Sequence, residues 1–178
     1  MQIELLTIGD ELLLGFTVDT NAAFIARALA ELGVEIVHRC TVGDDADRIA
    51  AAVAEAIERT GAVITTGGLG PTADDMTRPA IARLFGRELV RDERIVAQIE
   101  ARFRRLGTGT MPQTNIVQAM VPAGARVLLN HHGTAPGLWI EDAHGRWVVM
   151  LPGVPREMRG MTIDTIVPML RERIGSAT

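Results

Sequence analysis

The 178-residue chain contains no lysine, because all 18 of its basic residues are arginine. This absence excludes a Walker-A phosphate site, a Schiff base to a carbonyl substrate or pyridoxal phosphate, and a lysine general base. Charge chemistry in this chain must therefore rely on carboxylates, arginines and four histidines.

Cysteine and aromatic residues are also scarce. The single cysteine, Cys40, excludes an intrachain disulfide and a cysteine-based zinc site. We interpret Cys40 as a small core residue in a reducing compartment rather than as a reactive thiol. With four Phe, two Trp and no Tyr, the core must be built from aliphatic side chains.

Long apolar runs and an excess of basic residues are missing as well. No apolar run approaches the roughly 20 residues of a membrane span, and the acidic start at Glu4 is unlike a secretory signal. We therefore expect a cytoplasmic protein with no membrane partner. The net charge of −4 argues against a nucleic-acid partner, which would need a basic face and usually stacking aromatics. The length is typical of one domain, which we place over residues 1–178.

Hydrophobic periodicity predicts alternating strands and helices in the first half of the chain. Each expected strand precedes an amphipathic helical pattern, and the strands are residues 3–8, 34–42 and 62–66. This order predicts an α/β fold with three layers and a doubly wound, mostly parallel sheet. Short strands are expected later, at residues 127–129, 138–140 and 147–151, the last two forming a small C-terminal β-hairpin before a C-terminal helix.

Polar loops follow the first three predicted strands. In parallel sheets of this kind, ligands bind beyond the carboxyl ends of the strands. The loops therefore converge on one rim, and their sequences are Gly9-Asp10-Glu11, Gly43-Asp44-Asp45 and the segment from Gly67 to Asp75.

The loop after the third strand holds three glycines within four residues, Gly67, Gly68 and Gly70. Backbone N–H groups that approach a ligand closely, together with the start of a helix, form a cradle for an anion such as phosphate. The spacing differs from the Gly-x-Gly-x-x-Gly fingerprint, so we do not predict a Rossmann dinucleotide site. A tight turn without a ligand is the alternative interpretation.

Paired aspartates stand beside this cradle. Carboxylates such as Asp75 would repel a phosphate unless a cation lies between them, and Mg²⁺ typically takes one or two protein carboxylates plus phosphate oxygens. Asp44, Glu11 and Asp10 are further candidate oxygen donors on the same rim, with solvated loop acids as the alternative for Glu11 and Asp10. The alternative is that an aspartate of the Asp44-Asp45 pair or the Asp74-Asp75 pair caps the following helix, which we expect for one of Asp74 and Asp75.

Few basic side chains are positioned to bind a phosphate at this rim. Arg78, in the helix after the glycine loop, and Arg156 are the best candidates to meet a phosphate, with an exposed helical arginine as the alternative for each. His131 and His132 are candidates for a proton donor or a ligand, or else ordinary loop histidines.

Seven segments, in order along the chain, resemble the N-terminal domain of the CinA family of competence/damage-inducible proteins. They run from Gly9 to Gly15, Asp19 to Ala22, Val42 to Asp45, Thr66 to Thr77, Asn115 to Ala119, Gly133 to Gly137 and Pro152 to Met158. That domain is similar to the MoaB/Mog group of molybdopterin-binding folds, whose Thr-Gly-Gly and Asp-x-Thr elements match Thr66-Gly67-Gly68 and Asp75-Met76-Thr77.

The resemblance implies a MoaB/Mog-like fold, a homo-oligomer and a phosphorylated small-molecule ligand. For the CinA domain it implies metal-dependent hydrolysis of ADP-ribose, or a related nucleotide sugar, to AMP and ribose 5-phosphate. For the MoaB/Mog relatives it implies molybdopterin binding without hydrolysis, which is the alternative function. A third hypothesis is an interaction module whose rim is degenerate.

The rim residues and the resemblance together give the expected site. Asp75 and Asp44 are expected at the reactive site, and a divalent metal (Mg²⁺, Mn²⁺ or Co²⁺) is expected on Asp75, Asp44 and Glu11. The expected ligand-binding residues are Thr66, Gly67, Gly68, Leu69, Gly70, Thr72, Thr77, Asn115, Gln118 and Gly153.

The sequence departs from the family pattern in two places and in its length. Asp10 stands where the family commonly has threonine, and His131-His132 replace a proline and an aliphatic residue. Typical family members continue into a nicotinamide-nucleotide amidohydrolase domain, to which no segment here corresponds, so we expect no deamidase activity from this chain.

Overall fold

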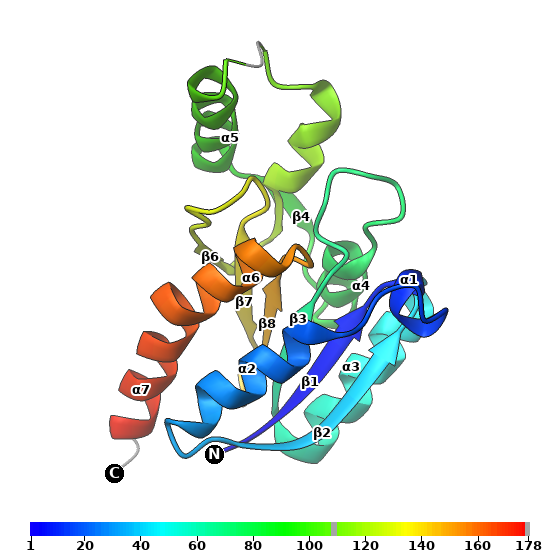
Figure 1. The fold of residues 1–178 in the computed structure, drawn as a ribbon, viewed down its shortest axis with the longest axis vertical. Coiled ribbons are helices and arrows are strands. Elements are labelled where there is room, and N and C mark those ends of the chain that lie inside the picture. Colours follow the sequence, from blue (N-terminus) through cyan, green and yellow to red (C-terminus); the bar gives the residue numbers. More distant parts are fainter. Residues whose placement is uncertain (108–109, 177–178) are drawn as a thin grey trace.

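The computed structural model describes residues 1–107 and 110–176, which form three layers around a central sheet (Figure 1). Its six strands lie in the order β2-β1-β3-β8-β7-β6. Strands β2, β1, β3 and β8 run parallel, whereas β7 and β6 are antiparallel to their neighbours. The strands are β1 (Gln2–Ile8), β2 (Glu35–Val42), β3 (Ala62–Thr66), β6 (Arg126–Leu128), β7 (Gly137–Glu141) and β8 (Trp147–Leu151). The predicted α/β class with a mostly parallel sheet is therefore confirmed, as is the hairpin between β7 and β8.

Helices cover both faces of the sheet. One face packs against α2 (Thr20–Ala30) and a long C-terminal helix made of α6 (Pro155–Met161), a π-helical turn η2 (Thr162–Ile166) and α7 (Val167–Gly175). The other face packs against α3 (Ala46–Thr60), α4 (Thr77–Leu84) and α5 (Glu93–Arg105). Figure 1 shows the first group in front of the sheet and α3 behind it.

The alternation of side chains along β1 explains the two cores. Ile3 and Leu5 are buried against the α2 face, whereas Leu6 and Ile8 are buried against the α3 face. A strand that is apolar on both faces is typical of a parallel sheet with helices on each side.

Local capping explains where α3 begins and ends. The Asp45 carboxylate accepts a hydrogen bond from the backbone N–H of Arg48, so the expectation that one residue of the Asp44-Asp45 pair caps this helix is confirmed. Gly61, with φ of 71°, ends the helix in the left-handed conformation that glycine adopts without a steric penalty.

Several short elements leave no recognisable pattern in the sequence. They are the helix α1 (Asp10–Leu13), the 3₁₀ segment η1 (Gln113–Ala119) and a separate antiparallel pair, β4 (Leu89–Arg91) with β5 (Met120–Pro122). Elements of three to seven residues contain too few positions for a period of 2.0 or 3.6 to be recognised. Figure 1 shows α5 and η1 together at the end of the molecule away from both termini.

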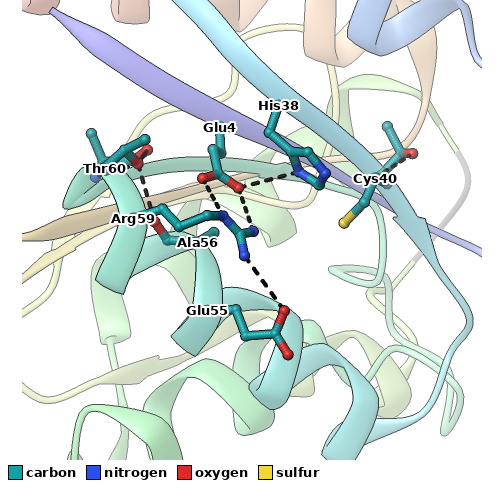
Figure 2. A network of polar contacts seen from close by, with 9 residues as sticks. Glu4, His38, Cys40, Glu55, Ala56, Arg59 and Thr60 are labelled. Atoms are coloured by element: carbon teal, nitrogen blue, oxygen red, sulfur yellow. Dashed lines mark hydrogen bonds and ion pairs between the residues drawn. The ribbon is translucent and has the colours of Figure 1, made fainter.

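One charged side chain lies inside the α3 face of the sheet. Glu4 on β1 is fully buried, and its carboxylate accepts hydrogen bonds from Arg59 Nε at 2.8 Å and Nη2 at 2.7 Å (Figure 2). His38 Nδ1 lies 3.3 Å from the same carboxylate. Burial and the nearby Glu4 raise the pKa of the Cys40 thiol, so Cys40 stays protonated at neutral pH, in agreement with a structural role.

Among the described residues, no helix combines the length and the apolar character that crossing a membrane requires.

Candidate functional site at the glycine-loop rim

The loops that follow β1, β2 and β3 meet at one edge of the sheet and line a pocket of about 430 Å³, here called the rim pocket. Figure 1 shows this edge beside α1 and the start of α6. Ten of the residues expected at the site line it: Glu11, Asp44, Gly67, Gly68, Leu69, Gly70, Thr72, Asp75, Gln118 and Gly153. Three expected ligand-binding residues are not part of its lining: Thr66, Thr77 and Asn115.

The glycine loop packs so closely that side chains would not fit. A Cβ on Gly67 would collide with the carbonyl oxygen of Ile8, and one on Gly68 would collide with Thr77 Oγ1. Both glycines also have positive φ, 108° and 65°. The Thr77 hydroxyl donates a hydrogen bond of 2.8 Å to the carbonyl oxygen of Gly67 and so joins the loop to α4.

Not every amide of this loop is free to bind an anion. Gly67 N–H donates to the Leu151 carbonyl, and Gly70 N–H donates to the Asp75 carboxylate. The N–H groups of Gly68 and Leu69 donate to no residue in the described part of the chain, and both residues line the rim pocket. The anion cradle expected from Gly67 to Gly70 therefore has only two amides available for an anion, those of Gly68 and Leu69.

Asp75 closes the same loop. Its Oδ1 accepts from Gly70 N–H at 2.7 Å, and its Oδ2 accepts from the N–H and the hydroxyl of Thr72 at 2.8 and 2.5 Å. The prediction that Asp74 or Asp75 caps the following helix is wrong, since the cap position of α4 is Met76 and no side chain caps it. The first amide of α4, Thr77 N–H, donates to the Gly68 carbonyl instead.

Several negatively charged side chains surround Asp44. Its carboxylate accepts a hydrogen bond from the backbone N–H of Asp10. Burial raises the pKa of Asp44, the hydrogen bond from Asp10 opposes this, and the carboxylates of Asp10, Glu11 and Asp75 raise it further. Three neighbouring carboxylates therefore act on Asp44, which lines one edge of the pocket.

Thr66 and Asn115 support the pocket from outside its lining. The Thr66 hydroxyl donates to the Pro152 carbonyl at 2.9 Å and accepts from Asn21 Nδ2, which also donates to the Gly153 carbonyl at 2.8 Å. These bonds tie the end of β3 to α2 and to the turn before α6. Asn115 Nδ2 donates to Gln118 Oε1 at 2.9 Å, which orients a side chain that does line the pocket.

Residues 4–172 match a family model described as "Probable molybdopterin binding domain". A CinA-like protein from Gemmatimonas aurantiaca is 66% identical over 174 residues, which make up 98% of this chain and 41% of that protein. The crystal structure of the protein CinA from Thermoplasma acidophilum, whose function is described as unknown, has a TM-score of 0.83 and 36% identity and covers 97% of each chain. The chain belongs to the CinA family.

A more distant likeness concerns the fold alone. The molybdopterin biosynthesis enzyme MoaB from Thermus thermophilus superposes with a TM-score of 0.62 at 22% identity, covering 95% of this chain and 91% of that one. The expected MoaB/Mog-like fold is therefore confirmed. This CinA-family chain spans about two fifths of the length of the curated relatives it matches, since the coverage of the first two is 41%.

The acidic side chains of this CinA-family pocket could hold a cation only if a bound ligand supplied further ligand atoms to it. No group of three His, Cys, Asp or Glu side chains within residues 1–107 and 110–176 is arranged to hold a metal ion. Asp75 already accepts three hydrogen bonds, whereas Oδ1 of Asp44 and the Glu11 carboxylate accept none from described side chains or amides. Such a donor set fits Mg²⁺, which usually completes its shell with water and phosphate oxygens.

Neither of the two arginines expected to meet a phosphate lines the pocket. Arg78 is only 1% exposed, and its Nη2 has no hydrogen-bond partner among the described residues. Burial lowers the pKa of Arg78 to about 10, against the opposing effect of the Asp75 charge. Arg156 is exposed. The alternative for Arg78, an exposed helical arginine, is wrong, because tertiary packing buries its side chain. Its contact with a phosphate stays a prediction.

The lining also includes residues that were not assigned to the site from the sequence, among them Thr134, Ala135 and Glu157. Glu157 Oε2 accepts a hydrogen bond of 2.6 Å from Asn130 Nδ2, and a Cβ on Gly133 would collide with the Glu157 carboxylate. Both segments occur among the motifs of the family resemblance, but no spacing along the chain indicates that they meet. Neither His131 nor His132 lines the rim pocket, and His132 Nε2 instead lies 2.8 Å from Asp164 Oδ2.

Proposed function

We propose that this CinA-family chain hydrolyses the pyrophosphate bond of ADP-ribose, or of a related nucleotide sugar, to AMP and ribose 5-phosphate. The observation that carries the proposal is the rim pocket, which combines two free loop amides with a cluster of carboxylates. Its volume of about 430 Å³ is within the range of small-molecule sites. Amides favour a phosphate, and the carboxylates need a cation before a phosphate will approach.

The cation is proposed to be Mg²⁺, Mn²⁺ or Co²⁺, held by Asp44 and Glu11 with Asp75 at its side. A divalent ion in this position neutralises phosphate charge and increases the acidity of bound water. Asp44 suits this role because burial and its acidic neighbours raise its pKa, so an approaching cation relieves an unfavourable arrangement of charges.

The chain itself contributes positioning and electrostatic stabilisation, which carry most of the catalysis of phosphoryl transfer. The N–H groups of Gly68 and Leu69 point to no partner in the described residues and are assigned to the phosphoryl oxygens. Thr72 holds the loop through Asp75, and Gln118, fixed by Asn115, is assigned to the nucleotide.

The test is incubation of the purified chain with ADP-ribose and each of the three metals, followed by measurement of AMP. We expect metal-dependent AMP from the wild type and a loss of at least about a hundredfold in Asp75→Asn, which combines loss of loop order with loss of charge. Asp47→Asn is a matched control, because Asp47 is an exposed acid outside the pocket lining. Absence of metal-dependent AMP, or full activity in Asp75→Asn, would contradict the proposal.

A second candidate function is molybdopterin binding without hydrolysis. The match of residues 4–172 to the molybdopterin-binding family model favours it. Saturable binding of molybdopterin by a chain that leaves ADP-ribose intact would establish this alternative. Failure to bind any pterin would eliminate it.

A further inference from the structure

A second pocket, of about 360 Å³, lies between α5 and the loop that connects β6 to β7, and it is here called the α5 pocket. It adjoins the rim pocket, because Thr134 lines both. In Figure 1 this loop (yellow) lies below α5 (green). A hydrogen bond of 3.0 Å from Arg102 Nη2 to the His132 carbonyl joins the helix to the loop.

The two adjoining pockets have opposite charge. Among the described residues that line the α5 pocket, the ionisable side chains are Arg102, Arg105 and His131, and none is a carboxylate. The rim pocket, by contrast, is lined by five acids and no arginine: Glu11, Asp44, Asp74, Asp75 and Glu157.

The basic side chains of the α5 pocket are not neutralised locally. Neither Arg102 nor Arg105 forms an ion pair with a described residue, and Arg102 uses one of its five N–H donors in the bond to His132. Of the nearby acids, Glu100 pairs with Arg104 and Asp164 contacts His132, whereas Glu157 accepts a hydrogen bond from the neutral Asn130 amide and keeps its charge. An anion would therefore find free donors on Arg102 and Arg105, with the Glu157 carboxylate, which lies against Gly133, as a competing negative charge.

We propose that the α5 pocket binds a phosphomonoester group carried by the same ligand whose pyrophosphate occupies the rim pocket. Guanidinium groups bind phosphate oxygens in a planar, bidentate manner, and Arg102 and Arg105 bring two of them to one cavity. Thr134 marks the place where the ligand passes from one pocket to the other. The inference rests on the proposed function and narrows the substrate class to nucleotide sugars with a phosphate beyond the pyrophosphate.

The first experiment measures binding of inorganic phosphate by calorimetry in the presence of EDTA. Without a divalent cation the acids of the rim pocket repel phosphate, and the net charge of −4 disfavours unspecific binding, so bound phosphate reports the α5 pocket. Arg105→Gln and the double variant Arg102→Gln/Arg105→Gln are compared with Arg104→Gln. Arg104 is on the same helix, pairs with Glu100 and does not line the pocket.

We expect phosphate to bind the wild type and Arg104→Gln equally, and to bind Arg105→Gln at least about tenfold more weakly, because a charge-assisted hydrogen bond is lost. The Arg105 side chain is exposed and makes no hydrogen bond to a described residue, so its variant should fold normally, and unchanged thermal unfolding confirms this. No phosphate binding by the wild type, or equal binding by the double variant, would overturn the proposal.

The second experiment compares kcat/KM for ADP-ribose and for ADP-ribose that carries a 2′-phosphate on the adenosine ribose. We expect about a tenfold preference for the phosphorylated substrate, abolished in Arg105→Gln and retained in Arg104→Gln. Hydrolysis of both substrates without preference would overturn the assignment of the pocket to the ligand. If neither is hydrolysed, the proposed function fails, and phosphate binding in EDTA still decides whether the α5 pocket is an anion site.

Discussion

Asp10 and Asp44 each donate their backbone N–H to the carboxylate of the other, at 3.0 Å from Asp10 N to Asp44 Oδ2 and 3.2 Å from Asp44 N to Asp10 Oδ1. This reciprocal pair fastens the loop after β1 to the loop after β2. Gly43 makes the approach possible, since a Cβ there would collide with Asp10 Oδ1. Two carboxylates are thus fixed side by side at the rim, although their like charges repel each other.

The first prediction concerns how much this arrangement of two carboxylates lowers the stability of the fold. Because the pKa of Asp44 is raised in the folded protein above its ordinary value of 3.8, ionised Asp44 destabilises the fold, and this effect grows as the pH rises through the folded pKa. Asp44→Asn keeps an acceptor for Asp10 N–H and removes the charge. In EDTA we expect a small rise in melting temperature at pH 7 and none at pH 3, where both proteins are neutral at this position.

The same variant should lose the proposed hydrolysis, so stability and activity should change in opposite directions. Asp47→Asn, the exposed control, should show neither effect. A lower melting temperature of Asp44→Asn at pH 7 would show that the hydrogen bond from Asp10, rather than charge repulsion, dominates at this site.

The second prediction separates the shape of the glycine loop from the stability of the fold. A Cβ on Gly70 would collide with the Asp75 carboxylate, whereas the backbone of Gly70 has no positive φ. Gly70→Ala should therefore displace Asp75 and release the amides that it holds, with a loss of about 1–2 kcal/mol in the free energy of unfolding. Phosphate-ligand affinity, measured by calorimetry with metal present, should fall about tenfold.

Gly175→Ala is the matched control for this change, because no atom lies within 4 Å of a Cβ at that position. It should leave ligand affinity unchanged and should not lower the free energy of unfolding, because alanine favours a helix over glycine. Normal ligand affinity in Gly70→Ala would indicate that the position of Asp75 does not matter for binding.

Regular patterns made the larger elements predictable. The apolar runs at residues 3–8 and 62–66 are strands buried on both faces, and the acids that follow parallel strands meet at one edge because parallel strands end at the same side of a sheet. The convergence of Glu11, Asp44 and Asp75 on one pocket follows from topology alone.

Details that depend on contacts between distant segments were not predictable. Asp75 occupies a position from which aspartates often cap a helix, yet the closed loop turns its carboxylate back to Gly70 and Thr72. Arg78 has the sequence context of an exposed helical residue, and its burial depends on how α4 packs against α3 and β5. Glu157 meets Gly133 across more than twenty residues of chain, which no local period encodes.

The third prediction follows from the burial of Arg78. Because burial lowers its pKa to about 10, keeping its charge inside the fold costs about 3 kcal/mol. Replacing an unpaired buried charge by an apolar side chain of similar length removes that cost, so Arg78→Met should raise the free energy of unfolding by about 1–3 kcal/mol. Urea denaturation with Arg83→Met as control, an exposed arginine of the same helix, measures the difference. A destabilised Arg78→Met would mean that the guanidinium is stabilised by its surroundings after all.

The final prediction tests the bond that joins the glycine loop to α4. Thr77 is fully buried, and its hydroxyl holds the Gly67 carbonyl at 2.8 Å, which fixes the peptide plane that directs the free amide of Gly68. The Thr77 N–H holds the Gly68 carbonyl and so the peptide plane of the Leu69 amide. Thr77→Val keeps the volume but leaves a buried carbonyl without this donor, so the free energy of unfolding should fall by about 1–3 kcal/mol. Thr77→Ser keeps the hydroxyl and should retain ligand affinity even though it loses a methyl group. If Thr77→Ser binds ligand as weakly as Thr77→Val, packing of the methyl group, and not the hydrogen bond, sets the orientation of the loop.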